Sequence, residues 1–171
     1  MSAPSFDLPP PPPPAGSSFA DTWRRVVTDP RGFFAEMPLA GGLGEPMTFL
    51  AVCALVNGVG RLLVTWSLWS VIGSVIWLVL GGLVGATVLT LVAQQLFDGK
   101  AGFEPTFRVV AYAAAPAVLF WIPWLAVVPW VWSLYLAVRG VEQVHELPPE
   151  RAVLTVAIGT AVVWLLAAGL V

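Results

Sequence analysis

The stretch LLVTWSLWSVIGSVIWLVLGGLVGATVLTLVAQQLF, from Leu62 to Phe97, contains 36 residues and no charged side chain. About 20 apolar helical residues are enough to cross a hydrocarbon layer roughly 30 Å thick. As one helix the stretch would be about 54 Å long. We therefore expect it to break near Thr65–Ser70, where small polar residues lie between two tryptophans, since tryptophan gathers at the membrane–water interface.

Three further stretches carry no charge: 46–60, 109–138 and 152–171, of 15, 30 and 20 residues. Charged residues make up 11% of the chain, against about 25% in soluble proteins. We therefore expect an all-α polytopic integral membrane protein, a five-helix transmembrane bundle preceded by short amphipathic interfacial helices. The expected spans are about 47–63, 71–95, 109–121, 125–138 and 152–171. A re-entrant hairpin over 109–138 is the alternative to two of these spans.

The basic residues predict an orientation, because arginine and lysine collect on the cytoplasmic side. With five crossings and a cytoplasmic N-terminus, only Arg61 faces outward. The first 18 residues lack the basic and apolar regions of a signal peptide. The scarcity of lysine beside arginine suggests a bacterial genome, so we expect a multi-pass protein of the bacterial cytoplasmic membrane. The residues expected inside are Arg24, Arg25, Arg31, Lys100, Arg108, Arg139 and Arg151.

Residues 1–18 form a proline-rich segment with six consecutive prolines at 9–14. This composition favours a disordered tail, and the alternative is a polyproline ligand for an aromatic groove. Residues 19–38 then read as two short helices, capped by Ser18 and by Asp29 before Pro30. We expect this segment to lie in the headgroup layer, or else to pack against the spans. Its expected interfacial anchors are Phe19, Trp23, Arg24, Arg25, Phe33 and Phe34.

Arg61 is the one ionisable residue inside a predicted span, and Asn57 precedes it by four residues on the same helical face. Ionisable residues in spans often mark functional sites. The pair is therefore a candidate contact for a lipid headgroup or anion. The alternative is that Arg61 only reaches out to interfacial water.

Small residues and prolines predict how the spans pack. Gly81 and Gly85 form a GxxxG pair of the kind that brings helices together. Pro116 removes a backbone donor and clashes with the carbonyl of Tyr112. We therefore expect the third span to bend near Tyr112–Pro116, and spans three and four to form a tight hairpin around Pro123.

Other chemistry has little support in the sequence. Cys53 is the single cysteine, which excludes an intramolecular disulfide and a cysteine-based zinc cluster. A net charge of -2 without a basic patch speaks against nucleic-acid binding. His145, near Glu142 and Glu146, is expected to be a solvated loop histidine, with a weak metal site as the alternative. No catalytic grouping is recognisable, so we expect a non-enzyme without a cofactor.

Several motifs together resemble a known family. Asp29-Pro30-Arg31-Gly32-Phe33-Phe34 precedes the spans, and FRVVAYAAAP, WSLYLAVRG and ERA follow at 107–116, 132–140 and 150–152. The chain resembles the bacterial branch of the YIP domain family, the Ypt/Rab-interacting membrane proteins. The resemblance implies five membrane helices and a cytoplasmic N-terminus. Eukaryotic members act in vesicle traffic as adaptors for lipidated small GTPases, but their Asp-Leu-Tyr-Gly-Pro signature is absent from this sequence.

The function expected from these observations is a membrane scaffold or adaptor that works through helix and lipid contacts. Its expected partners are the bilayer, other membrane proteins or further copies of itself, without a GTPase. The alternative is a small transporter or lipid-handling channel. A polar cavity lined by Asn57, Arg61 and Gln94 would favour that alternative.

Overall fold

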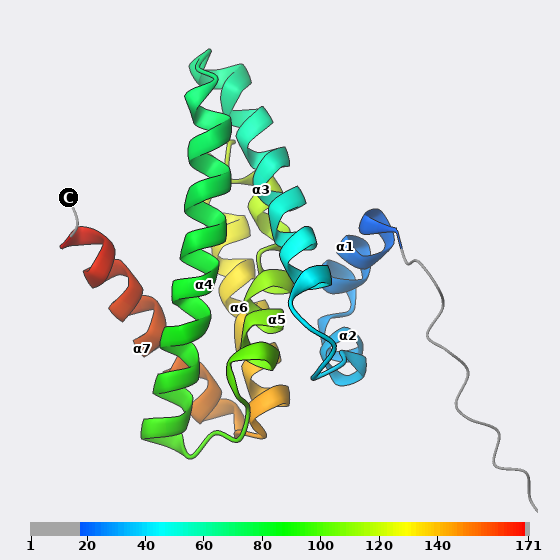
Figure 1. Ribbon diagram of the computed structural model, residues 1–171, viewed down its shortest axis with the longest axis vertical. Helices are drawn as coiled ribbons and strands as arrows, with labels where there is room; N and C mark the ends of the chain where they lie inside the picture. Colours follow the sequence, from blue (N-terminus) through cyan, green and yellow to red (C-terminus); the bar gives the residue numbers. More distant parts are fainter. Residues whose placement is uncertain (1–17, 170–171) are drawn as a thin grey trace, which may run out of the picture.

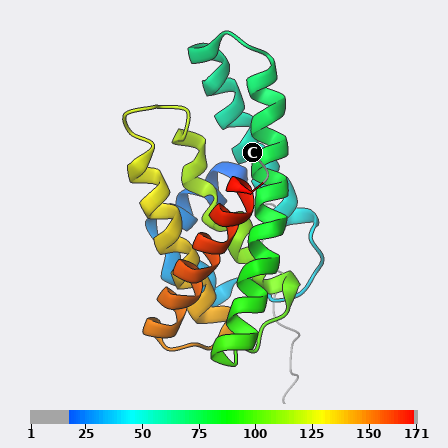
Figure 2. The same ribbon diagram turned by 90° about the vertical axis from the view of Figure 1, so that its left-hand side faces the viewer.

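A computed structural model describes residues 18–169, and this part of the chain is helical with no β-strand (Figure 1). The proline run at 9–14 lies outside the described residues, and so do the proposals of a disordered tail and a docking ligand. The two longest helices, α3 (Gly44–Thr65) and α4 (Trp69–Phe97), form an antiparallel hairpin. Its tip extends beyond the other helices (Figures 1 and 2).

The turn at this tip is short because Trp66 adopts a left-handed conformation with φ of 54°. Its backbone N–H donates to the carbonyl of Leu62, which ends α3. Both Trp66 and Trp69 are largely exposed there. An exposed tryptophan pair at the end of two apolar helices is typical of a membrane–water interface.

The remaining helices continue the alternation of direction. They are α5 (Phe103–Ala113), the 3-10 helix η1 (Ala115–Leu119), α6 (Val127–His145) and α7 (Pro149–Ala168). The loops 98–102 and 146–148 consequently lie together at the end opposite the tip. Helix α4 packs against α3, α5 and α7, while α6 packs against α5 and α7.

The expectation of five full spans is wrong on length and composition. Within residues 18–169, three helices are long and apolar enough to cross a membrane: α3, α4 and α7. The expected third span, 109–121, is not one helix, because α5 ends at Ala113 and η1 follows. Eleven residues of α5 reach only about 16 Å. That is half of a bilayer core about 30 Å thick.

The expected fourth span, 125–138, became part of a longer and more polar helix. Helix α6 has 19 residues, but its last two turns carry Arg139, Glu142 and His145. Its apolar part is therefore too short to span by itself. Helices α5, η1 and α6 instead form a shorter hairpin beside α3 and α4 (Figure 2).

The N-terminal helices are α1 (Phe19–Thr28) and α2 (Pro30–Glu36). The hydroxyl of Ser18 accepts from the backbone of Asp21, and the carboxylate of Asp29 accepts from that of Gly32 at 3.1 Å. A Cβ at Gly32 would lie 2.2 Å from the Asp29 carboxylate, so a larger residue there would displace the capping side chain. Helix α2 packs on α6, and α1 touches η1 and α5.

Candidate functional site

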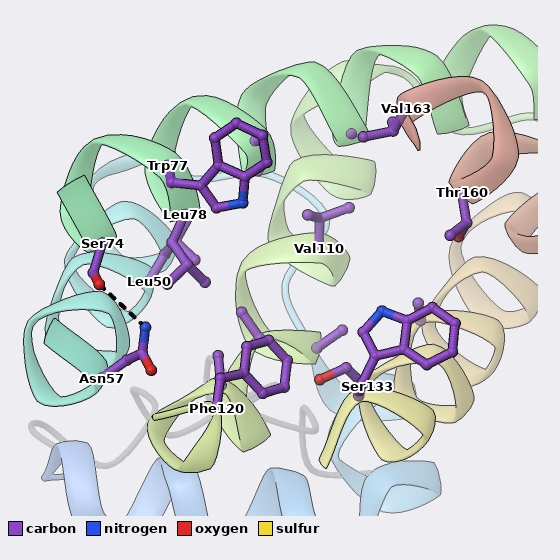
Figure 3. A pocket seen from close by; sticks show the side chains of 18 of the residues that line it. Leu50, Asn57, Ser74, Trp77, Leu78, Val110, Phe120, Ser133, Thr160 and Val163 are labelled. Carbon is purple, nitrogen blue, oxygen red and sulfur yellow. Dashed lines mark hydrogen bonds between the residues drawn. The ribbon is translucent and has the colours of Figure 1, made fainter. Parts of the chain in front are cut away.

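A groove of about 710 Å³ is lined by residues of the α3–α4 hairpin and of α5, η1, α6 and α7 (Figure 3). Apolar side chains and glycines form most of its wall, and Trp77, Phe120 and Val163 line it from three different elements. The few polar groups come from α3, α4, α6 and α7. They are Asn57, Arg61, Ser70, Ser74, Ser133 and Thr160.

Glycines of α4 give the groove its depth. A Cβ built on Gly73, Gly81 or Gly85 would have no atom within 4 Å. Gly82 is different, since its Cβ would lie 2.8 Å from the side chain of Leu50 on α3. The expected packing pair, Gly81 and Gly85, therefore has no helix of the described chain against it. These glycines leave a space in the groove.

Asn57 is the most buried polar residue of the groove, with 4% of its surface exposed. Its Nδ2 donates to Ser74 Oγ at 3.4 Å, and its Oδ1 has no partner. A bond of this length is weak, and a buried polar atom without a partner costs about 1–3 kcal/mol. Figure 3 shows the Asn57 amide at the edge of the groove, with its nitrogen toward Ser74.

Arg61 follows Asn57 by one turn of α3 and also lines the groove. Its side chain is exposed and makes no ion pair with any described residue. Gln94, the third residue expected in such a cavity, is not part of it. Its amide donates to the carbonyl of Ala101 at 2.9 Å, at the other end of the molecule.

The region here called the polar end comprises the loops 37–43, 98–102 and 146–148 opposite the tip, the adjoining turns of α5, α6 and α7, and the helices α1 and α2 on the flank of the bundle. The break at Pro116 connects it to the bundle. Because Pro116 has no backbone N–H, the helical hydrogen-bond ladder of α5 cannot continue unbroken through it. Trp23 Nε1 of α1 donates to the carbonyl of Ala115, the first residue of η1, at 2.8 Å. Pro123 lies exposed in the turn that leads to α6.

An aromatic cluster holds α1 and α2 in place. The ring of Phe33 lies 4.9 Å from that of Tyr112, which lies 5.1 Å from that of Phe49. Phe19 of α1 contacts Phe49 at 5.1 Å, and Phe34 is buried. Four of the six expected interfacial anchors are aromatic, and all four contact the bundle. This arrangement corresponds to the packing alternative.

The two arginines among the expected anchors stay on the surface. Arg25 forms an exposed ion pair with Glu36 of α2, and Arg24 is also exposed. Arg31 and Arg139 line a second cavity of about 640 Å³, where Arg139 donates to Glu142 at 2.8 Å. The arginines are therefore distributed around the outside of the aromatic cluster.

Buried charge fixes the loop between α2 and α3. Arg108 is 2% exposed, and its guanidinium donates to the carbonyl of Gly42 at 2.7 Å. Glu104, one turn earlier on α5, lies 3.6 Å from Arg108 and accepts from the backbone N–H of Gly42 at 2.7 Å. Gly42 has φ of 84°, which glycine adopts without strain.

His145 is not the solvated loop residue that the sequence suggested. It is the last residue of α6 and 1% exposed, because the 98–102 loop covers it. Thr106 Oγ1 donates to the carbonyl of Gly102 at 2.8 Å and lies 2.9 Å from His145 Nε2, within hydrogen-bond distance. Burial lowers the pKa of His145 from 6.5 to about 4.

The sequence analysis missed most of the groove, although it named Asn57 and Arg61. Residues such as Ser133 and Thr160 come from α6 and α7 and meet α4 only in the fold. The described residues hold no group of three metal-ligating side chains, and Glu142 and Glu146 do not join His145 in one.

Comparisons with known proteins give a single match, which is to a protein family. No curated protein and no solved structure matches the chain. The sequence profile of the Yip1 domain does match, over residues 24–171. This range includes the aromatic motif of α2, the buried Arg108, the break at Pro116 and both sides of the groove, so the chain belongs to the Yip1 domain family of membrane proteins.

Proposed function

We propose that this protein is an integral membrane scaffold or adaptor that presents its polar end to partners in the aqueous phase. The observation that carries the proposal is the segregation of charge. Between Leu62 and Phe97 no residue is charged, and among residues 18–169 Arg61 is the only charged residue near the tip of the hairpin. The ion pairs Arg25–Glu36 and Lys100–Glu146 both lie exposed at the polar end.

The packing of the polar end supports an adaptor role. An adaptor surface needs a defined shape, because ordering flexible groups on binding costs affinity. The aromatic cluster and the Trp23–Ala115 hydrogen bond tie α1 and α2 to the bundle. Exposed charges on these helices therefore keep fixed positions relative to one another.

Site-specific photo-crosslinking in native membranes tests this proposal. Crosslinkers replace Ala20 or Ala35, which are small and exposed on α1 and α2, and in matched samples Leu80 or Leu165, which are exposed on apolar helices. We expect discrete protein adducts at the first two positions, which weaken when Arg24→Gln removes a neighbouring charge. Lipid adducts alone at all four positions would contradict the proposal.

The orientation is part of the same proposal, with the polar end in the cytoplasm because seven of the eight basic residues fall there. In a Cys53→Ala background, Lys100→Cys and Glu146→Cys should resist an impermeant maleimide added to intact cells. Trp66→Cys and Trp124→Cys, which are largely exposed, should react. The reverse labelling pattern would overturn this orientation.

The groove favours a second candidate, a lipid-handling protein or small transporter. Its walls are apolar, with a few hydroxyl and amide groups and one cation, Arg61. Reconstitution in liposomes with a fluorescent phospholipid tests this candidate. Faster movement of the lipid between leaflets than in empty liposomes would support this candidate. An unchanged rate would contradict it and would leave the adaptor role as the single proposal.

A further inference from the structure

We infer that the groove binds one anionic phospholipid, with its phosphate at Arg61, its glycerol region at Asn57 and an acyl chain along the glycines of α4. This inference extends the second candidate function in one respect, the entry of lipid into the groove. The inference requires that the lipid binds in the groove, and it does not require that the protein transports the lipid. It does not depend on the adaptor role of the polar end.

The path of the acyl chain follows from the open side of α4. Gly73, Gly81 and Gly85 face no atom within 4 Å, and Leu89 also lines the groove. From Gly73 to Leu89 the helix rises about 24 Å, a large part of one bilayer core about 30 Å thick. A chain of methylenes fits such an apolar channel, which runs along the direction of a span.

The headgroup position follows from charge. Of the residues that the structure describes, Arg61 is the only charged one that lines the groove, and it lies four residues before the end of α3 at Thr65. Its guanidinium is exposed and makes no ion pair in the described chain. A guanidinium pairs well with phosphate, to which it can donate two parallel hydrogen bonds. Ser70 of α4 also lines the groove, but its hydroxyl donates to the carbonyl of Ser67 at 2.6 Å.

Asn57 is the second and independent observation that points to a ligand. It is 4% exposed, and one amide atom lacks a hydrogen-bond partner while the other makes a bond of 3.4 Å. The terminal torsion of asparagine is broad, and Ser74 can either donate to this amide or accept from it. A flip of the amide about this torsion therefore presents either the oxygen or the NH2 group to the groove. One turn inward from Arg61 is where the ester groups of a phospholipid lie when its phosphate is at the guanidinium.

The occupant could instead be a helix of a second copy, because glycine faces also bring helices together. Lipid fits the observations better, since the apolar helices of a second copy in the same orientation bring no acidic side chain to the level of Arg61. The hairpin tip near that position carries no acidic residue: Arg61 and Asp98 bound a charge-free stretch. The test below separates the two occupants.

The test uses the full chain in detergent, with native mass spectrometry and phosphatidylglycerol or phosphatidylcholine as the added lipid. We expect one phosphatidylglycerol per chain to bind in preference to phosphatidylcholine. Arg61→Gln should weaken phosphatidylglycerol binding about tenfold or more, the loss of one charge-assisted contact. Arg151→Gln, an exposed arginine at the polar end, is the matched control and should change nothing.

A second variant tests the chain path without touching charge. Gly81→Leu fills open space, so it should fold and yet exclude the lipid, while Ala157→Leu adds the same side chain on an exposed face of α7 outside the groove. Equal phosphatidylglycerol binding by the wild type, Arg61→Gln and Gly81→Leu would overturn the inference. So would a wild-type dimer that Gly81→Leu converts to a monomer without any change in lipid binding. Flux in liposomes is measured separately, so a failure of transport does not count against binding.

Discussion

Gly99 and Gly140 of the polar end are pressed against other atoms, whereas Gly73, Gly81 and Gly85 of the groove face open space. A Cβ at Gly140 of α6 would lie 2.3 Å from Val109 of α5, and one at Gly99 would lie 2.6 Å from His145 Nδ1. Gly85 has no such neighbour. The same residue type thus allows close helix packing in one region and creates a cavity in the other.

Buried polar side chains of the two regions differ in the length of the bonds they make, although each region holds buried atoms without a partner: Arg108 Nε and His145 Nδ1 at the polar end, and Asn57 Oδ1 and Ser133 Oγ in the groove. At the polar end, Arg108 bonds to the Gly42 carbonyl at 2.7 Å and His145 to Thr106 at 2.9 Å. In the groove, the only side-chain bond of Asn57 is 3.4 Å long. Short bonds in buried surroundings hold side chains in one arrangement. The polar end is therefore suited to a fixed surface, and the groove keeps bonding capacity for a ligand.

The largest expected effect comes from exchanging single glycines for alanine in the two regions. Gly140→Ala should lower the free energy of unfolding by about 1–3 kcal/mol or more, because the added methyl overpacks the contact with Val109. Gly85→Ala should leave stability unchanged or raise it by up to about 1 kcal/mol, since alanine favours helix. Thermal unfolding in detergent measures both, and equal effects would remove the distinction between the regions.

A pH dependence should also belong to the polar end. The pKa of His145 is lowered from 6.5 to about 4 by burial, so protonation favours the unfolded chain. Its penalty is absent above about pH 7 and grows as pH falls from 6.5 toward 4. Between pH 7.5 and pH 5 this residue should cost about 2 kcal/mol of stability.

The control for this prediction is His145→Gln, which keeps a polar side chain that does not titrate. Lys100 and Glu146, which form an ion pair beside this loop, and Glu142, one turn earlier on α6, are the nearby charged residues. They are present in both proteins, and unperturbed glutamate titrates near pH 4.3. The wild type should lose stability on acidification to pH 5 more steeply than the variant. Parallel curves would show that His145 is not held neutral by burial.

The sequence alone was sufficient for the helical membrane class and the family, because charge-free runs and local motifs are both continuous in the chain. The predicted number of spans was wrong, because the hydropathy of residues 109–138 does not indicate where the helices in this stretch end. Pro116 ends α5, and Arg139 belongs to a helix that continues to His145. A break and a helix extension of this kind depend on neighbours. Trp23 satisfies the Ala115 carbonyl from a distance of 92 residues along the chain.

The candidate site was predictable only in part for the same reason. Asn57 and Arg61 are one turn apart, so a local pattern identifies them together. Gln94 is also polar, but its side-chain amide donates a hydrogen bond to the backbone carbonyl of Ala101 in the 98–102 loop. The role of Gly81 depends on which helices leave α4 uncovered, and no pattern within α4 contains that information.

The smallest expected effect sharpens the comparison at the junction between α1 and the bundle. Trp23→Phe keeps an aromatic ring but removes the N–H that donates to the Ala115 carbonyl at 2.8 Å. We expect a loss of about 1 kcal/mol, which makes opening of the N-terminal helices about five times more frequent. Trypsin cleavage after Arg24 and Arg25 should accelerate by that factor when cleavage reports local opening.

Trp124→Phe is the matched control, because Trp124 is 98% exposed in the turn after η1 and makes no contact with α1. It should leave the rate of cleavage after Arg24 and Arg25 unchanged. If both variants behave like the wild type, the indole bond does not hold α1, and the aromatic cluster around Tyr112 alone must do so. In that case Phe33→Leu, which removes the ring 4.9 Å from Tyr112, should release the helices. The outcome therefore decides whether the polar end is fixed by one hydrogen bond at the helix break or by its aromatic packing.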